Sequence, residues 1–250
     1  TTGVAAGLAS TGKIPVFAAI AAFVTNRNYE AFRNDIAYMG QNVKIVGRNG
    51  GITYSDLGPT HYSLEDYAII RMLPGVVVLS PQDPGEIREA AKAMIEHDGP
   101  VYMRIGGPSI PDLFPQAPFT IGEGRMIREG SRATVVTTGT ITPEVVVAVQ
   151  RLADDGIDVD LIGMPTVEPV DAALIRASAH RTGRVITVEE HYTRGGLSAA
   201  VGEALATSGI PVHAIGLPHE HIVTGTYPGL LARYALDAAG LDERIRLLVR

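Results

Sequence analysis

Apolar and amphipathic stretches alternate along the first part of the chain. Short continuous apolar runs predict buried strands, and stretches with apolar residues three or four positions apart predict helices. The pattern predicts strands at 14–20, 43–46, 76–79 and 101–105, and helices at 3–9, 29–39, 64–72 and 84–97. Strands that alternate with helices form parallel sheets covered by helices, so this part is predicted to be a doubly wound α/β domain.

The same alternation returns after a segment rich in proline. Phe114 and Phe119 lie within that segment, which is typical of a linker held to the surface by its aromatic side chains. Beyond it the pattern predicts strands at 133–137, 159–162, 184–188 and 212–215, and helices at 143–154, 171–180, 196–207 and 228–239. We therefore predict an α/β protein with two doubly wound, mainly parallel-sheet domains, at residues 1–107 and 132–250, joined by a linker at 108–131.

Composition narrows the classes of function. The chain has 250 residues, a formal net charge of −6 and no cysteine. The absence of a dense Lys/Arg cluster argues against a nucleic-acid groove or an anionic membrane surface, and the absence of cysteine excludes disulfides and thiolate metal sites. No apolar run approaches the ~20 residues that span a bilayer, so we expect a cytoplasmic protein with a small-molecule substrate.

The stretch 56–61 is the first candidate for chemistry. It follows the predicted strand 43–46, contains the turn Gly58-Pro59, and ends at His61 just before a predicted helix. Loops that follow parallel strands lie at the carboxyl edge of the sheet, where such sheets bind ligands. The alternative is an ordinary turn in which His61 hydrogen-bonds to the backbone.

Two other polar clusters have a structural interpretation. The sequence His219-Glu220-His221 supplies no third ligand for a metal, so a solvated loop is favoured. Glu189-Glu190-His191, followed by Gly195-Gly196, lacks the full dinucleotide-binding fingerprint and is interpreted as structural. No Gly-x-Ser-x-Gly sequence occurs, which argues against a hydrolase.

Taken together, the motifs resemble the transketolase family. The pyrimidine-binding domain of that family is matched by Gly3–Ala9, Ile14-Pro15, Ile20–Phe23, Arg33–Ile36, Val43–Val46, Gly58–His61, Leu73-Pro74, Pro81–Asp83, Glu86 and Gly99–Arg104, and its C-terminal domain by Val188–His191 and Gly195–Leu197. The chain is most similar to the C-terminal subunit of a split transketolase. The family's Gly-Asp-Gly and Asn signature for holding a diphosphate is not in this sequence.

The resemblance implies a thiamin-diphosphate site shared with a second chain. That partner, an N-terminal transketolase subunit, would hold the diphosphate and its divalent metal, Mg²⁺, in an α2β2-type assembly. Phe23 matches the aromatic that stacks on the pyrimidine ring, and Ile20 stands where the family usually has a second aromatic. The family's activating glutamate would lie just upstream of Thr1, so we expect residues before Thr1.

The resemblance also assigns the substrate side. His61 matches the active-site histidine, whose pKa near neutrality suits proton transfer at the substrate oxygen. Leu57, next to Asp56, replaces an acid that reads a substrate hydroxyl. Asn49 replaces a phosphate-contacting histidine, and Gly106-Gly107 replace a phosphate-binding arginine.

These departures permit several interpretations. Arg48 or Arg104 could supply the missing arginine, or the loop alignment could be shifted. We favour the hypothesis that the substrate is not an ordinary sugar phosphate, and that a two-carbon ketol or acyl unit passes from a donor to an acceptor aldehyde. The alternatives are the β subunit of a 2-oxo-acid dehydrogenase decarboxylase component and a non-catalytic scaffold subunit.

Overall fold

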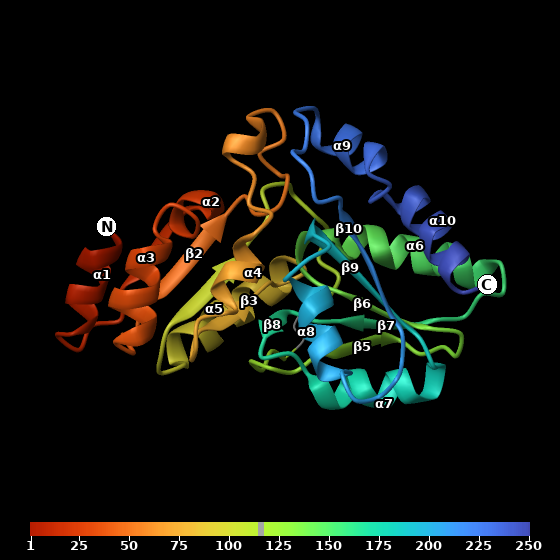
Figure 1. The fold of residues 1–250 in the computed structure, drawn as a ribbon, viewed down its shortest axis with the longest axis horizontal. Coiled ribbons are helices and arrows are strands. Elements are labelled where there is room, and N and C mark those ends of the chain that lie inside the picture. Colours follow the sequence, from red (N-terminus) through yellow and green to blue (C-terminus); the bar gives the residue numbers. More distant parts are fainter. Residues whose placement is uncertain (115–117) are drawn as a thin grey trace.

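Two five-stranded sheets organise the chain in a computed structural model that describes residues 1–114 and 118–250 (Figure 1). The first sheet has the order β1-β2-β4-β3-β8, in which only β8 is antiparallel to its neighbour. Its strands are Val16–Ile20 (β1), Lys44–Arg48 (β2), Val77–Leu79 (β3), Val101–Arg104 (β4) and Thr166–Glu168 (β8).

The helices of the first half differ in detail from the prediction. They are Thr2–Ala9 (α1), Ala21–Val24 (α2), Tyr29–Ala31 (α3), Asp66–Ile70 (α4) and Pro84–Glu96 (α5), with a π-helix at Phe32–Tyr38 (η1) and a 3-10 turn at Gly58–Thr60 (η2). The helix predicted at 29–39 is thus mostly π-helical. The helix predicted at 64–72 is shorter because Ser63 instead pairs with Gly51 in a β-bridge.

The second sheet has the order β10-β9-β6-β7-β5, in which β5 is antiparallel to β7. Its strands are Arg125–Arg128 (β5), Thr134–Thr137 (β6), Asp160–Gly163 (β7), Val185–Tyr192 (β9) and Val212–Leu217 (β10). The helices are Thr142–Asp154 (α6), Ala172–Thr182 (α7), Leu197–Ala204 (α8), Tyr227–Arg233 (α9) and Ala238–Leu248 (α10), with a 3-10 turn at Gly139–Ile141 (η3). The prediction of two mainly parallel sheets in an α/β fold is confirmed.

Two segments of the second half differ from the prediction. The helix predicted at 228–239 is two helices, because Ala235 takes a left-handed backbone conformation and Asp237 caps a new helix through the Gly240 amide. The predicted linker contains β5, and its residues 115–117 lie outside the described residues.

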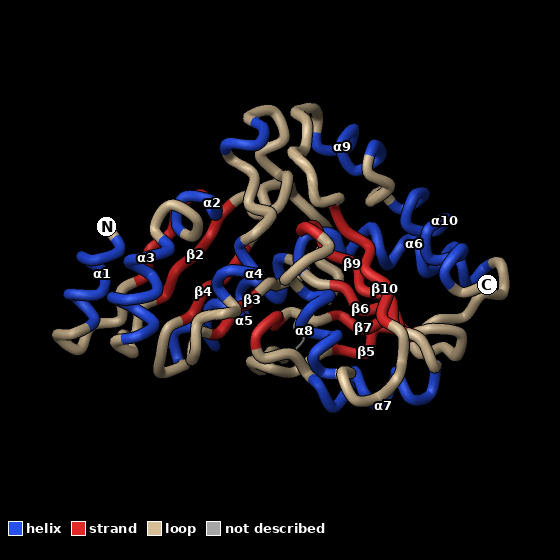
Figure 2. The backbone as a smooth tube through the Cα atoms, viewed as in Figure 1, coloured by secondary structure: helices blue, strands red, loops and turns tan. Residues whose placement is uncertain are grey.

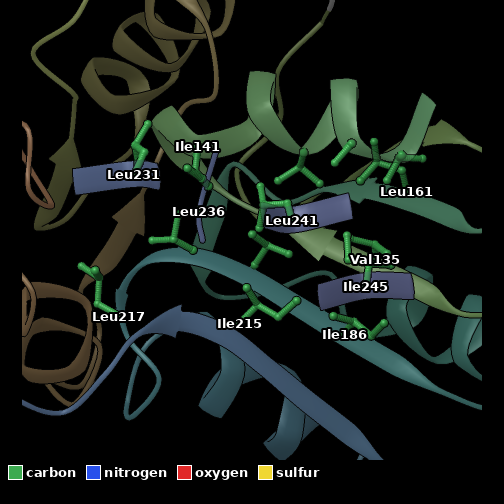
Figure 3. Packing of buried hydrophobic residues seen from close by; sticks show 14 of the residues in the cluster. Val135, Ile141, Leu161, Ile186, Ile215, Leu217, Leu231, Leu236, Leu241 and Ile245 are labelled. Atoms are coloured by element: carbon green, nitrogen blue, oxygen red, sulfur yellow. The ribbon is translucent and has the colours of Figure 1, made fainter. Parts of the chain in front are cut away.

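The two sheets are physically joined. Strand β8, which follows the second-sheet strand β7 in sequence, pairs with β3 of the first sheet, as Figure 2 shows near the centre of the molecule. Ile52, Tyr62 and Leu64 also belong to the largest hydrophobic cluster, which otherwise consists of residues after 130. Figure 3 shows part of this cluster, where α6 and α10 cover one face of the second sheet. The loop that contains His61 is therefore packed against both halves.

Among residues 1–114 and 118–250, no helix combines the length and the apolar character needed to cross a membrane.

Candidate functional site

The candidate site begins at the carboxyl ends of β1 and β2. These parallel strands end level with each other, with Ile20 paired in register to Arg48. Ile20 immediately precedes α2, which carries Phe23, and Arg48 immediately precedes Asn49. Four residues that the sequence singled out therefore start from one edge of the first sheet, where parallel α/β sheets bind ligands.

Phe23 and His61 lie together beyond this edge. Their ring centroids are 5.2 Å apart at an interplanar angle of 58°, and the ring of Tyr54 meets His61 edge-on at 5.8 Å. The Nδ1 atom of His61 is 2.9 Å from the hydroxyl of Thr60. The imidazole is thus held between two aromatic rings with one nitrogen already engaged.

A hollow of about 380 Å³ opens beside these rings. It is lined by Ala22, Phe23, Asn26, Arg27, Pro59, Thr60, His61, Tyr62 and Glu65. The side-chain amide of Asn26 donates to Glu65 Oε2 at 3.4 Å, which joins α2 to the segment after His61. Ile20 lies at the end of β1 and is not among the lining residues. The hollow combines an apolar ring, an imidazole and polar groups at its rim.

The two positions that depart from the family's phosphate contacts are in contact with each other. Asn49 has a left-handed backbone (φ 56°), which asparagine tolerates better than most residues. A Cβ atom placed on Gly107 would overlap Asn49 Nδ2. The Asn49 amide therefore occupies the space into which any side chain at position 107 would start.

Arg104 does not face this site. Its side chain is 6% exposed, and its Nη1 atom lies 3.1 Å from Asp66 Oδ1. Its guanidinium carbon lies 4.3 Å from the ring centroid of Tyr67, and Nη2 donates to the carbonyl oxygen of Glu190 at 2.6 Å. The interpretation of Arg104 as a substitute phosphate ligand is therefore wrong. Arg48 is exposed and remains the arginine of this pair that a ligand can reach.

Asp56 and Leu57 lie on the outer part of the same loop. Asp56 is exposed and lines a second, more open hollow of about 560 Å³ with Ser55 and Thr224–Tyr227. Leu57 is 47% exposed. These two residues lie on the solvent side of the loop, whereas His61 faces Phe23.

The two remaining polar clusters lie elsewhere. His219 packs edge-on against Tyr192, with ring centroids 5.4 Å apart. Within the part of the chain that the structure describes, no group of three His, Cys, Asp or Glu side chains could hold a metal ion. Glu189, Glu190 and His191 are buried, and His191 stacks on Tyr67 with centroids 5.2 Å apart.

Two contributors to the site escape the sequence interpretation. Tyr54 packs against His61 although it carries no motif, and its only signal is an aromatic within the same loop. Glu190 reaches that loop from β9 through the amide of Ile52, a contact between residues 138 positions apart that no local pattern reveals.

Comparison with known proteins places this geometry in a family. Residues 1–110 match the family described as "Transketolase, pyrimidine binding domain", and residues 122–241 match "Transketolase, C-terminal domain". One of the two subunits of the apulose-4-phosphate transketolase of Phocaeicola vulgatus is 37% identical over 96% of this chain and 77% of its own length. The 6-deoxy-6-sulfo-D-fructose transketolase subunit SqwH of a Clostridium species is 38% identical over 86% of this chain and 67% of its own length.

Solved structures agree with this placement. A split-gene transketolase described as an inactive β4 tetramer superposes with a TM-score of 0.89 and 36% identity, covering 99% of this chain and 79% of that one. The transketolase of Campylobacter jejuni shares the fold, with a TM-score of 0.75 at 19% identity over 98% of this chain and 37% of that one. The chain belongs to the transketolase family, in which it carries the pyrimidine-binding and C-terminal domains and resembles split-transketolase subunits.

Proposed function

We propose that this chain is the C-terminal subunit of a two-chain, thiamin-diphosphate-dependent enzyme that transfers a two-carbon ketol unit from a donor to an acceptor aldehyde. The observation that carries the proposal is the convergence of Phe23 and His61 on one hollow at the carboxyl edge of the first sheet. An N-terminal, diphosphate-binding transketolase subunit would complete the site in an α2β2-type assembly.

The residues of the hollow fit the aminopyrimidine end of the cofactor. Phe23 offers a ring face for stacking, and Ile20 adds apolar surface at the strand end. When bound, thiamin diphosphate supplies the nucleophilic carbon that attacks a donor carbonyl. The metal and diphosphate ligands are assigned to the partner, because the family's signature for them is not in this sequence.

His61 is the proposed acid–base residue. Since the hydroxyl of Thr60 engages Nδ1, Nε2 is the nitrogen that would meet a substrate oxygen and exchange a proton with it. The packing of Phe23 and Tyr54 on the imidazole restricts its orientation. Such restriction is what a group needs to transfer a proton at one defined atom.

The proposed donor is not an ordinary sugar phosphate. Asn49 and Gly107 stand at the two positions of the family's phosphate contacts, and Arg104 is committed to a buried ion pair. A glycine supplies none of the charge-assisted hydrogen bonding of an arginine. The relatives named above include one that is named for a phosphate ester and one that is named for a sulfo sugar, so the donor class has to be measured.

The test is a donor screen with the co-purified pair of subunits, thiamin diphosphate and Mg²⁺. Phosphorylated, sulfonated and unmodified ketoses are compared by kcat/KM, with carbon dioxide release from a 2-oxo acid as the arm for the decarboxylase alternative. We expect aldehyde-dependent transfer from a ketose without preference for the phosphorylated form. A strong preference for the phosphorylated donor would defeat the substrate proposal, and a pair that neither binds thiamin diphosphate nor transfers would favour the scaffold alternative.

A further inference from the structure

The loop that carries the candidate substrate residues is held from the second sheet. Residues 49–62, here called the substrate loop, connect β2 to the segment before α4. The backbone amide of Ile52 donates to Oε1 of Glu190, a residue of β9, at 2.7 Å. Glu190 is only 4% exposed, so this hydrogen bond lies inside the protein, where an unpaired amide or carboxylate would be costly.

Both oxygens of Glu190 have a partner. The hydroxyl of Tyr227 donates to Oε2 at 2.7 Å, and Arg104 donates to the carbonyl oxygen of Glu190. Burial raises the pKa of the Glu190 carboxyl above its ordinary value, whereas Arg104, the Tyr227 hydroxyl and the Ile52 amide favour its ionised form. The carboxyl is therefore confined in position by contacts on three sides.

The start of the substrate loop is shaped around this carboxyl. Gly51 has a left-handed backbone (φ 67°), and a Cβ atom there would overlap Glu190 Oε1. Gly51 thus suits the position for two independent reasons, its backbone conformation and the close approach of the acid. Asn49 is two residues before it, so the place of Glu190 bears directly on the place of Asn49.

A second set of contacts holds the middle of the loop. The amide of Gly225 donates to the carbonyl oxygen of Ser55 at 3.1 Å, and the hydroxyl of Tyr62 lies 2.9 Å from the carbonyl oxygens of both Ser55 and Val223. Thr224 lies against Gly58. Figure 1 shows the orange loop beside the blue segment that leads into α9.

We propose that Glu190 is a positioning residue of the candidate site. From the second sheet it fixes the first residues of the substrate loop, and through them the placement of Asn49 and of the His61 end. Its kinetic consequence rests on the proposed function above. Since a displacement of about 1 Å at a reacting group can cost ~10²-fold in rate, release of this anchor should be visible in turnover.

Two neighbouring acids allow a matched test. Glu189 is as deeply buried as Glu190, but its carboxylate accepts from the amides of Leu197 and Ser198 at 2.7 and 2.9 Å and caps α8 within the second half. The variants are Glu190→Ala, Glu189→Ala as the control, and Glu190→Gln as the conservative replacement. The glutamine can accept from Ile52 through its oxygen and meet Tyr227 through its amide.

The first measurement is amide hydrogen exchange in the full chain, with amides of β6 as the reference for global opening. We expect Glu190→Ala to raise exchange at the Ile52 amide at least about tenfold over the reference, while Glu189→Ala leaves Ile52 unchanged. If Glu190→Ala does not fold, Tyr227→Phe, which frees only Oε2, replaces it and should raise Ile52 exchange in the same direction. Unchanged protection of Ile52, or an equal increase in the Glu189→Ala variant, overturns the proposal.

The second measurement is steady-state turnover of the subunit pair. We expect kcat/KM for the donor to fall at least about tenfold in Glu190→Ala and to recover within about threefold in Glu190→Gln. Loss in both variants, or an equal loss in Glu189→Ala, would reveal a structural role only. A wild-type pair without transfer activity would refute the proposed function, while the exchange measurement would still decide whether Glu190 anchors the loop.

Discussion

Replacing Glu86 by glutamine should remove a specific part of the pH dependence of stability. Glu86 lies in the first turn of α5 and is 1% exposed. Its Oε2 accepts from the amide of Gln82 at 2.9 Å, and its Oε1 lies 3.8 Å from Arg125 Nε. Burial outweighs these contacts and raises the pKa of Glu86 from 4.5 to about 7.

The magnitude follows from that pKa. A shift of about 2.5 pKa units corresponds to ~3 kcal/mol, at about 1.4 kcal/mol per unit. Because the folded state binds the proton more tightly than the unfolded state, the contribution of Glu86 to stability is fully present below pH 4.5 and is lost as the pH rises through 7. The variant Glu86→Gln should match the wild type near pH 4 and exceed its free energy of unfolding by about 3 kcal/mol at pH 8.

The assay is urea denaturation of both proteins across this pH range. The matched control is Glu123→Gln, because Glu123 lines the same cavity as Glu86 but is exposed. The control should show no pH-dependent difference from the wild type. A difference between Glu86→Gln and the wild type that stays constant from pH 4 to 8 would refute the pKa and the burial argument behind it.

Three further predictions concern the candidate site. Gly107→Arg alone should gain no preference for a phosphorylated donor because its Cβ overlaps the Asn49 amide, whereas Gly107→Arg combined with Asn49→Gly should raise the ratio of kcat/KM for phosphorylated over unmodified donor at least about tenfold relative to Asn49→Gly alone. His61→Ala should lower kcat by ~10²-fold or more while thiamin diphosphate binding, followed by titration of the subunit pair, changes little; unchanged turnover would remove His61 from the chemistry. Arg104→Met should lower the free energy of unfolding by about 3–5 kcal/mol because it leaves Asp66 buried without its counter-charge, and a change in donor preference without loss of stability would contradict the structural role.

The sequence predicts the sheets better than it predicts side-chain directions. The alternation of apolar runs and amphipathic helices is sufficient for two mainly parallel sheets, because each parallel strand is buried on both faces. That same burial removes the two-residue period in β4, where Val101–Arg104 are all buried. Without that period, no sequence pattern distinguishes an Arg104 that faces the ligand from one that faces Asp66.

Contacts between distant segments set the second limit. Strand β8 spans only Thr166–Glu168 and joins a sheet formed by the first hundred residues, which neither its length nor its composition announces. The hydrogen bond from Ile52 to Glu190 is equally remote in sequence. By contrast, the proximity of Phe23 to His61 follows from one local rule, that segments after parallel strands gather at the same sheet edge.

The contact between Asn49 and Gly107 bears on the choice between a shifted alignment and an altered substrate. The family's histidine and arginine would cooperate on one phosphate only if their positions were adjacent in space. Here the side chain of residue 49 fills the space above residue 107, so the two departures from the family are one change at one place. A shift of the loop alignment alone would have no reason to bring that pair into contact. The contact therefore supports the proposal of a donor that is read without a phosphate clamp, and it explains why restoring the arginine requires removal of the asparagine side chain.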